Sequence, residues 1–116
     1  MEQLLLTLDF FQRQKVIHRD IKIENILVSE VSEPANYDIR VADFGLAVFT
    51  PHDEYLRRRC GSPGYAAPEV LLGRPYNYKA DIFSAGAVFF NLLTRRYLFS
   101  GETVEDIVVK NARCEL

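Results

Sequence analysis

This sequence of 116 residues contains no long apolar run and only two cysteines, and neither sign of charge is in large excess. No apolar stretch approaches the roughly 20 residues that a transmembrane helix needs. The run from Leu4 to Leu8 is too short for the core of a secretory signal, and Glu2 stands where positive charge is expected. Cys60 and Cys114 alone do not make a disulfide framework, so we expect reduced thiols in an intracellular, cytoplasmic protein. The net charge of −2 gives no bulk attraction to polyanions, so neither nucleic acid nor a membrane is expected as a partner.

The composition is that of one folded domain. Hydrophobic residues make up 48% of the chain and charged residues 26%, which is typical of globular proteins and not of disordered ones. At this length we expect one domain at most, with a modest core. There is no internal repeat and no low-complexity segment.

The first half of the chain predicts a helix followed by a hairpin. Leu4, Leu8 and Phe11 recur at helical spacing with Leu5 beside them, which predicts an amphipathic helix over residues 1–15. Two β-type runs, 25–28 and 37–42, flank a cluster of turn residues at 32–36, which predicts a β-hairpin. Residues 46–60 have little periodicity, and residues 50–54 are expected to form an exposed loop.

The second half predicts two further helices. One spans residues 81–94, with Asp81 as its N-cap and Arg95-Arg96 at the opposite end of its dipole. Its interior is apolar nearly all round, which indicates a helix buried on every side at the centre of a core. The other begins near Glu102 or Thr103, and its apolar face consists of Val104, Ile107 and Val108.

Three oxygen-bearing side chains, Asp20, Asn25 and Asp43, stand in two runs on either side of the predicted hairpin. Asp20 is followed by Lys22 and Asn25, and Asp43 comes directly before Phe44-Gly45. Carboxylate and amide oxygens are hard donors that suit Mg²⁺ and the phosphates it bridges. A single Asp-Phe-Gly is usually a turn, because Asp and Gly favour turns, but the whole set in this order indicates phosphoryl transfer.

These runs resemble the motifs of the eukaryotic protein kinase family. The match covers nearly the whole chain: His18–Asn25 resembles the catalytic loop, Asp43-Phe44-Gly45 the metal-binding triplet, Gly61–Glu69 the end of the activation segment and Asp81–Gly86 the start of the central helix. The fold class implied is α+β and mainly helical, a kinase C-terminal lobe fragment with a short β-hairpin and a buried central helix.

The resemblance assigns the chain to part of a domain. No glycine-rich phosphate loop, lysine strand or partner helix precedes His18. We therefore expect residues 1–116 to be a partial kinase domain without the N-terminal lobe, comprising the catalytic loop, metal triplet, activation segment, central helix and the start of the next helix. It is expected to depend on an N-lobe or a partner protein.

The resemblance also implies roles for residues that would act on ATP and Mg²⁺. Asp20 would orient the acceptor hydroxyl and accept its proton, and Lys22 would place positive charge on the γ-phosphate. Asn25 and Asp43 would hold Mg²⁺. The remaining residues assigned to the nucleotide are Glu24 and Leu27, with Leu27 as the floor of the adenine pocket.

Further residues are implied in support of the site. Ser62 would bond Asp20 and Lys22 and shape the pocket after the acceptor residue. The structural residues are His18 and Phe44, which would pack together, Glu69, whose usual arginine partner does not occur in this chain, and Asp81, which would also hold the catalytic-loop backbone.

Three departures from the family pattern stand out. Ile23 replaces the usual Pro and Phe83 the usual Trp, and both keep an apolar side chain. Arg58 stands where many members carry an activating phosphothreonine. The triplet Arg57–Arg59 is read either as a solvated loop face or as a contact for an acidic substrate or a regulator.

The function implied is that of a serine/threonine protein kinase with protein substrates, since Asp-x-Lys and Gly61-Ser62-Pro63 are of that type. The chain alone is expected to be inactive. The alternative is a catalytically silent kinase-lobe fragment that acts as a binding or decoy module, or an incomplete gene product.

Overall fold

The computed structural model of the protein describes residues 1–31 and 36–116, in a mixed arrangement of helices and small antiparallel sheets. The elements in chain order are α1 (Glu2–Arg13), β1 (Val16–Ile17), a 3₁₀ turn (Ile23–Asn25), β2 (Ile26–Val31), β3 (Asn36–Val41), β4 (Val48–Phe49), α2 (Pro68–Leu71), α3 (Lys79–Thr94) and α4 (Val104–Arg113). The predicted α+β class is therefore correct in this coarse sense.

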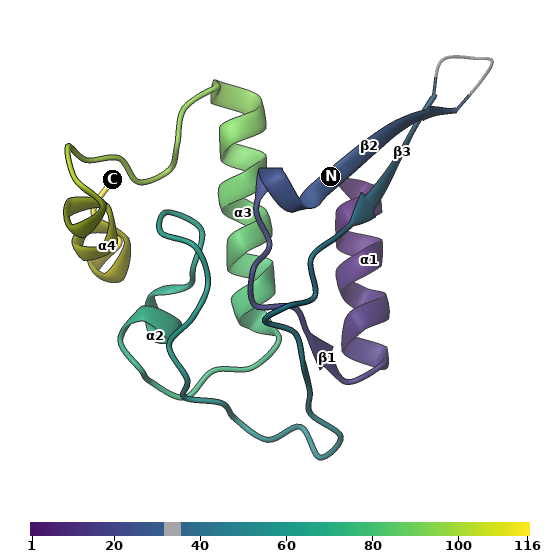
Figure 1. The fold of residues 1–116 in the computed structure, drawn as a ribbon, viewed down its shortest axis with the longest axis horizontal. Coiled ribbons are helices and arrows are strands. Elements are labelled where there is room, and N and C mark those ends of the chain that lie inside the picture. Colours follow the sequence, from purple (N-terminus) through teal and green to yellow (C-terminus); the bar gives the residue numbers. More distant parts are fainter. Residues whose placement is uncertain (32–35) are drawn as a thin grey trace.

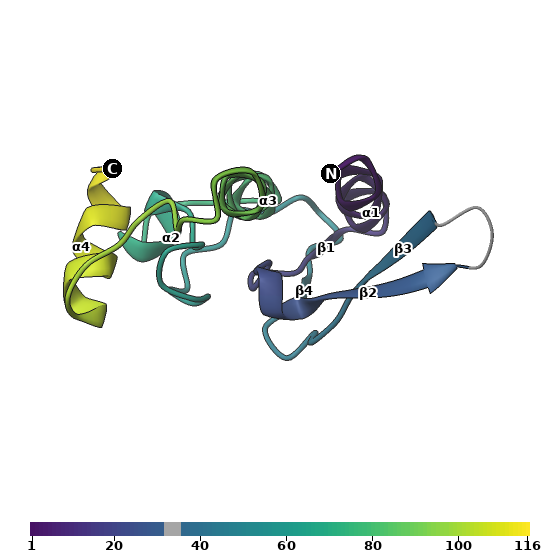
Figure 2. The same cartoon turned by 90° about the horizontal axis from the view of Figure 1, so that it is seen from above.

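The elements form a slab 20 Å thick. Figure 1 shows α1 and α3 side by side, with the β2–β3 hairpin reaching out past α1 and α4 at the opposite end. Seen from above, α4, α2, α3 and α1 follow one another along the slab, and the hairpin lies beneath α1 (Figure 2). The helix α3 thus stands in the middle of the molecule.

The first helix was predicted correctly apart from its end and one residue. Leu4, Leu8 and Phe11 are buried against α3 and the hairpin, as their spacing predicts. The helix ends at Arg13, two residues earlier than expected, before Lys15 takes a left-handed φ of 59°. Leu5 lies on the outer side and is 45% exposed, because each residue turns the helix by about 100° and carries Leu5 away from the buried stripe.

The hairpin is confirmed by the antiparallel pairing of β2 with β3, with Ile26 opposite Val41. Of its predicted turn, 32–36, residues 32–35 lie outside the described residues, and Asn36 begins β3. The exposed loop predicted at 50–54 holds except at Thr50, which is buried and bonds the Lys15 carbonyl. Before it, Val48–Phe49 forms β4 and pairs with β1 (Val16 opposite Phe49). A strand of two residues leaves no periodic pattern, which explains why the sequence did not reveal it.

The helix α3 differs from its prediction at its start. It begins at Lys79 with Tyr78 as the N-cap residue, and no side chain caps it. Asp81 therefore lies inside the first turn and is not the N-cap. Its carboxylate accepts hydrogen bonds from backbone groups of another segment instead.

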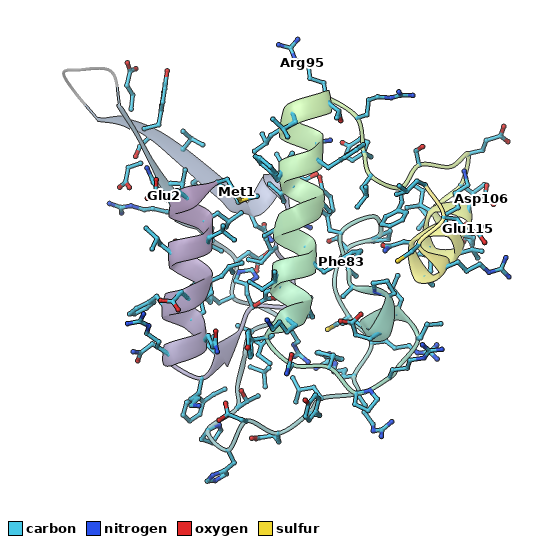
Figure 3. The ribbon with its side chains drawn as sticks, turned by 180° about the vertical axis from the view of Figure 1, so that it is seen from behind. Met1, Glu2, Phe83, Arg95, Asp106 and Glu115 are labelled. Carbon is cyan, nitrogen blue, oxygen red and sulfur yellow. The ribbon has the colours of Figure 1, made fainter. Side chains whose placement is uncertain are left out.

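The burial of α3 also differs from the prediction. Its buried residues are Ala80, Asp81, Ser84, Ala85, Ala87 and Val88. Four large apolar side chains are exposed instead: Ile82, Phe89, Leu92 and Leu93. The expected burial on every side does not hold in this chain, because α1 and the 65–67 segment cover only part of the helix. In Figure 3 Phe83 lies on the side of α3 that faces α2. Its ring stacks with the Phe99 ring, and the two ring centroids are 6.4 Å apart.

The last helix begins where predicted, with Thr103 as N-cap in a capping box with Asp106. Its inner face is shifted from the prediction. Ile107 and Val108 are half-buried, but Val104 is 59% exposed, and the fully buried residue is Asn111. The shift arises because α4 packs against α2 and the segment before it.

In the described part of the chain, no helix has the length and apolar character to cross a bilayer. Both cysteines are free thiols, with Cys60 half-buried and Cys114 exposed.

Candidate active site

The loop after β1 is anchored to the first turn of α3. The Asp81 carboxylate accepts hydrogen bonds from the backbone N–H of His18 at 2.8 Å and of Arg19 at 2.9 Å. Burial raises the pKa of the Asp81 carboxyl, and these two N–H bonds oppose the rise. Arg19 has a left-handed φ of 68°, so the loop turns sharply where Asp81 holds it. This anchor fixes the backbone immediately before Asp20.

The His18 ring is a buried link between this loop and the end of the hairpin. Its Nδ1 accepts the Asp20 N–H at 3.2 Å, so its Nε2 carries the proton and donates it to the Ala42 carbonyl at 3.0 Å. The Phe44 ring meets it edge-on, with the ring centroids 5.0 Å apart. The histidine is fully buried, and its two ring nitrogens are both occupied by backbone groups. It positions Asp20 and has no nitrogen left for a reacting group.

Asp20, Lys22 and Ser62 meet in a triangle of two hydrogen bonds and one ion pair. The Ser62 hydroxyl donates to Asp20 Oδ1 at 2.7 Å and accepts from Lys22 Nζ at 2.9 Å. Lys22 Nζ lies 3.5 Å from Asp20 Oδ2. A hydroxyl is therefore held between a carboxylate that can accept its proton and an ammonium group that can stabilise negative charge.

Asn25 is tied to the same carboxylate. Its Nδ2 donates to the Asp20 carbonyl oxygen at 2.8 Å and to Asp20 Oδ2 at 3.3 Å. Both bonds use the amide nitrogen, so the amide oxygen Oδ1 remains as a possible ligand. The side chain is buried, which restricts its motion.

Asp43 is brought beside Asn25 by the hairpin. The Ala42 N–H donates to the Asn25 carbonyl at 2.8 Å and so extends the β2–β3 pairing. Asp43 then turns with a φ of 58° and its Oδ1 accepts the Gly45 N–H at 3.1 Å. A Cβ at Gly45 would stand 3.1 Å from that oxygen, so a side chain there would crowd the carboxylate. The exposed Asp43 carboxylate is left with its second oxygen available.

The oxygen atoms of Asn25 and Asp43 fit a magnesium ion that takes its remaining ligands from a phosphate. Asn25 and Asp43 offer hard amide and carboxylate oxygens, as Mg²⁺ prefers. Among the described residues no group of three or more His, Cys, Asp or Glu side chains could hold a metal by themselves. An ion held here would take further ligands from water or from phosphate oxygens.

Three other predicted site residues are not hydrogen-bonded to this cluster in the part of the chain that the structure describes. Glu24 is exposed, and Leu27 is 56% exposed on the hairpin. Glu69 is half-buried, and no ion pair is formed by it within the described residues. A cavity of about 210 Å³ lies elsewhere, beside β1, and its lining includes Lys15, Thr50 and Asp53 but no residue of the Asp20 cluster.

Two residues that the sequence did not single out, Tyr76 and Asn111, bond the segments that carry Asp20 and Ser62. Tyr76 is buried, and its hydroxyl accepts from Arg19 Nη1 at 3.3 Å and donates to the Arg58 carbonyl at 2.6 Å. Arg19 Nε also donates to the Leu46 carbonyl at 2.6 Å. Asn111, the second missed residue, bonds the segment that follows Ser62. No local pattern marks either one, since each acts through backbone atoms distant in sequence.

A comparison with protein families matches this chain to the protein kinase domain over residues 1–116. Among curated proteins, it is 40% identical over 116 residues to the probable serine/threonine-protein kinase 2 of Plasmodium falciparum (isolate K1), covering all of this chain and 22% of that protein. It is 34% identical to the SNF1-like protein kinase ssp2 of Schizosaccharomyces pombe, over 97% of this chain and 19% of that one. It is 35% identical to the carbon catabolite-derepressing protein kinase of Saccharomyces cerevisiae, over 95% and 17%. The chain thus spans about a fifth of the length of these relatives.

Proposed function

Because the chain belongs to the protein kinase family, with relatives of the serine/threonine type, we propose that the protein carrying it transfers the γ-phosphoryl group of ATP to serine or threonine hydroxyls of protein substrates. The observation that carries this proposal is the triangle of Asp20, Lys22 and Ser62, in which a hydroxyl is shared by a carboxylate and an ammonium group.

Asp20 is the proposed base for the acceptor hydroxyl. Its carboxylate accepts the hydroxyl proton as the oxygen forms a bond to the γ-phosphorus and the bond to the β-bridging oxygen breaks, which releases ADP. Lys22, in contact with the same carboxylate, offsets negative charge on the transferring oxygens. The hydrogen bonds from Ser62 and Asn25 hold the carboxylate in one orientation, so little reorganisation is needed during the reaction.

Asn25 and Asp43 are the proposed magnesium ligands. The bound ion would neutralise charge on the β- and γ-phosphates. This chain contributes the amide oxygen of the buried Asn25 and the second carboxylate oxygen of Asp43, and the bond from the Ala42 N–H to the Asn25 carbonyl joins the two segments that carry them. Leu27 is the proposed floor of the adenine pocket, and Glu24 lies next to Asn25 at the same edge.

We assign residues 1–116 to the larger, helical lobe of a kinase domain. The hydrogen bonds of Asp81 and the ring packing of His18 with Phe44 support structural roles for these three residues. Glu69 is proposed as one member of an ion pair whose cation is not among the described residues.

The experiment is a chimera in which residues 1–116 replace the matching segment of the Saccharomyces cerevisiae carbon catabolite-derepressing kinase, to which the chain is 35% identical over 111 residues. We expect transfer of radiolabelled phosphate to serine peptides. Asp20→Asn should lower kcat about 10²- to 10⁴-fold, the usual range for a lost general base. Asp43→Asn and Asn25→Ala should abolish magnesium-dependent transfer and leave the fold intact.

The matched control is Asp9→Asn, an exposed carboxylate on α1 that pairs with Arg13. It should leave turnover unchanged. A folded chimera that binds ATP but phosphorylates no peptide would contradict the proposal and favour the silent binding module. The 116-residue chain alone should be silent, because it carries no glycine-rich loop to hold the phosphates. Turnover by the chain alone that disappears with Asp20→Asn would contradict this last expectation.

A further inference from the structure

Residues 56–59 and 72–76 lie beside the candidate active site and are joined by one antiparallel bridge. These two segments together are called the platform. Leu56 and Tyr76 exchange both backbone hydrogen bonds, with N–O distances of 2.8 and 2.9 Å. The Tyr76 hydroxyl bonds the Arg58 carbonyl at 2.6 Å from within the protein. The platform is therefore held to the core by a buried side chain.

The side chain of Arg59 reaches the second segment. Its Nη2 donates to the Leu72 carbonyl at 3.5 Å, and a Cβ at Gly73 would stand 3.0 Å from its Nε. Because Arg74 follows Gly73 directly, Arg59 lies against the backbone next to Arg74.

The platform carries four exposed arginines: Arg57, Arg58, Arg59 and Arg74. Over the described residues none of the four forms an ion pair, whereas Arg13 and Arg113 each have a carboxylate partner. The nearest acids in the sequence are engaged or half-buried: Asp53 pairs with Lys15, Glu54 accepts from the His52 N–H, and Glu69 lies half-buried. Positive charge is thus concentrated here in a chain whose net charge is −2.

We propose that this arginine platform binds an acidic stretch of the protein substrate. Guanidinium groups pair with carboxylates through two parallel hydrogen bonds, which suits a run of Asp or Glu. The inference rests on the proposed function, since it names the substrate class of the same site. It is carried by continuity: Arg59 stands three residues before Ser62, whose hydroxyl bonds Asp20. The segment that carries three of the arginines therefore leads directly to the residue that contacts Asp20.

The first test measures binding without catalysis. A fluorescent serine peptide with four Glu residues on one flank, and the same peptide with Ala or Lys in their place, are titrated against the 116-residue chain at low salt. We expect the Glu peptide alone to bind, more weakly as salt rises. Arg58→Gln and Arg74→Gln should each weaken binding about two- to fivefold, as expected for an exposed charge pair. The matched control Arg13→Gln removes an arginine that is paired with Asp9 and should change nothing.

The second test uses the chimera described above with the same peptides. We expect kcat/KM to be higher for the Glu peptide than for the Ala peptide, through KM, and the difference to shrink in Arg58→Gln. If the chimera phosphorylates no peptide, the proposed function fails, and the binding titration still decides the platform.

Equal binding of the Glu and Ala peptides, or equal loss in the Arg13→Gln control, would overturn the inference. So would a single-stranded oligonucleotide that binds more tightly than the Glu peptide, since the surface would then select polyanions in general. Displacement of the Glu peptide by equimolar inorganic phosphate would equally overturn it, because one anion and not an acidic stretch would be the ligand.

Discussion

Asn111 and Gly64 are joined by a buried hydrogen bond, in which the Gly64 N–H donates to Asn111 Oδ1 at 3.0 Å. The other end of the same amide donates from Nδ2 to the Ala66 carbonyl at 2.9 Å. One side chain on α4 thus satisfies two backbone groups of the segment that carries Ser62. Because Ser62 bonds Asp20, α4 is connected to the candidate active site through this amide.

Replacing Asn111 by Ala should destabilise the chain by about 2–4 kcal/mol. The change leaves a buried N–H and a buried carbonyl without partners, and each unsatisfied group costs roughly 1–3 kcal/mol. Urea unfolding of the dilute chain measures the loss. Asn91→Ala is the control, since Asn91 is half-buried on α3 and makes no side-chain hydrogen bond within the described residues. Equal losses for the two variants would show that the amide does not hold the segment.

Replacing Tyr76 by Phe should loosen the 56–60 segment. The ring would still fill its buried site, but the Arg58 carbonyl and Arg19 would lose the hydroxyl. We expect a loss of about 1–2 kcal/mol and faster amide hydrogen exchange at Leu56 and its neighbours. Tyr78→Phe removes a hydroxyl two residues away, and it should change neither quantity. Unchanged exchange in Tyr76→Phe would mean that the backbone bridge alone fixes this segment.

Tyr65 should make the chain less stable at high pH. Burial raises the pKa of its hydroxyl to about 12, and the negative charge of Glu24 adds to the rise, although the backbone of Ile23 opposes it. Its hydroxyl is buried without a hydrogen-bond partner among the described residues. The unfolded chain loses this proton near pH 10. Between pH 10 and 12 the folded state binds more protons than the unfolded state, so stability falls as pH rises.

The measurement is the urea midpoint at about pH 9 and about pH 11, on either side of the ordinary tyrosine pKa. Tyr65→Phe should remove part of the fall between these values, because Phe does not titrate in either state. Tyr55→Phe is the control, since Tyr55 is 66% exposed and should leave the fall unchanged. A fall that is identical in the wild-type chain and in Tyr65→Phe would refute the assignment.

The outer side of α3 should make the isolated chain self-associate. Ile82, Phe89, Leu92 and Leu93 are exposed on this helix, and exposed apolar patches of more than a few hundred Å² mark contact or aggregation sites. We expect the chain to bind hydrophobic dyes and to elute above its monomer mass. The double variant Leu92→Lys, Leu93→Glu should reduce both, and the exposed pair Glu115→Lys, Arg113→Glu serves as the control. A sharp monomeric elution of the unaltered chain would contradict this prediction.

The sequence by itself determined the three longer helices, the hairpin and the family. Leu4, Leu8 and Phe11 predicted α1 because helical periodicity is a local property, and the β-type runs predicted the hairpin for the same reason. The motifs around Asp20 and Asp43 identified the kinase family because their residues lie close together in the chain. Local spacing is visible without any tertiary structure.

Only the tertiary structure decided how distant groups are satisfied. The helical pattern predicted Asp81 as a helix cap, and only the family resemblance implied its contact with the catalytic loop; in the structure it accepts the N–H groups of His18 and Arg19, more than sixty residues earlier in the chain. No pattern in the sequence drew attention to Asn111, which is buried and bonds the backbone of Gly64 and Ala66. Buried polar groups must find partners wherever packing places them. Backbone N–H and C=O groups are alike in all residues except proline, which lacks the N–H, so local spacing carries no mark of which side chain they will meet.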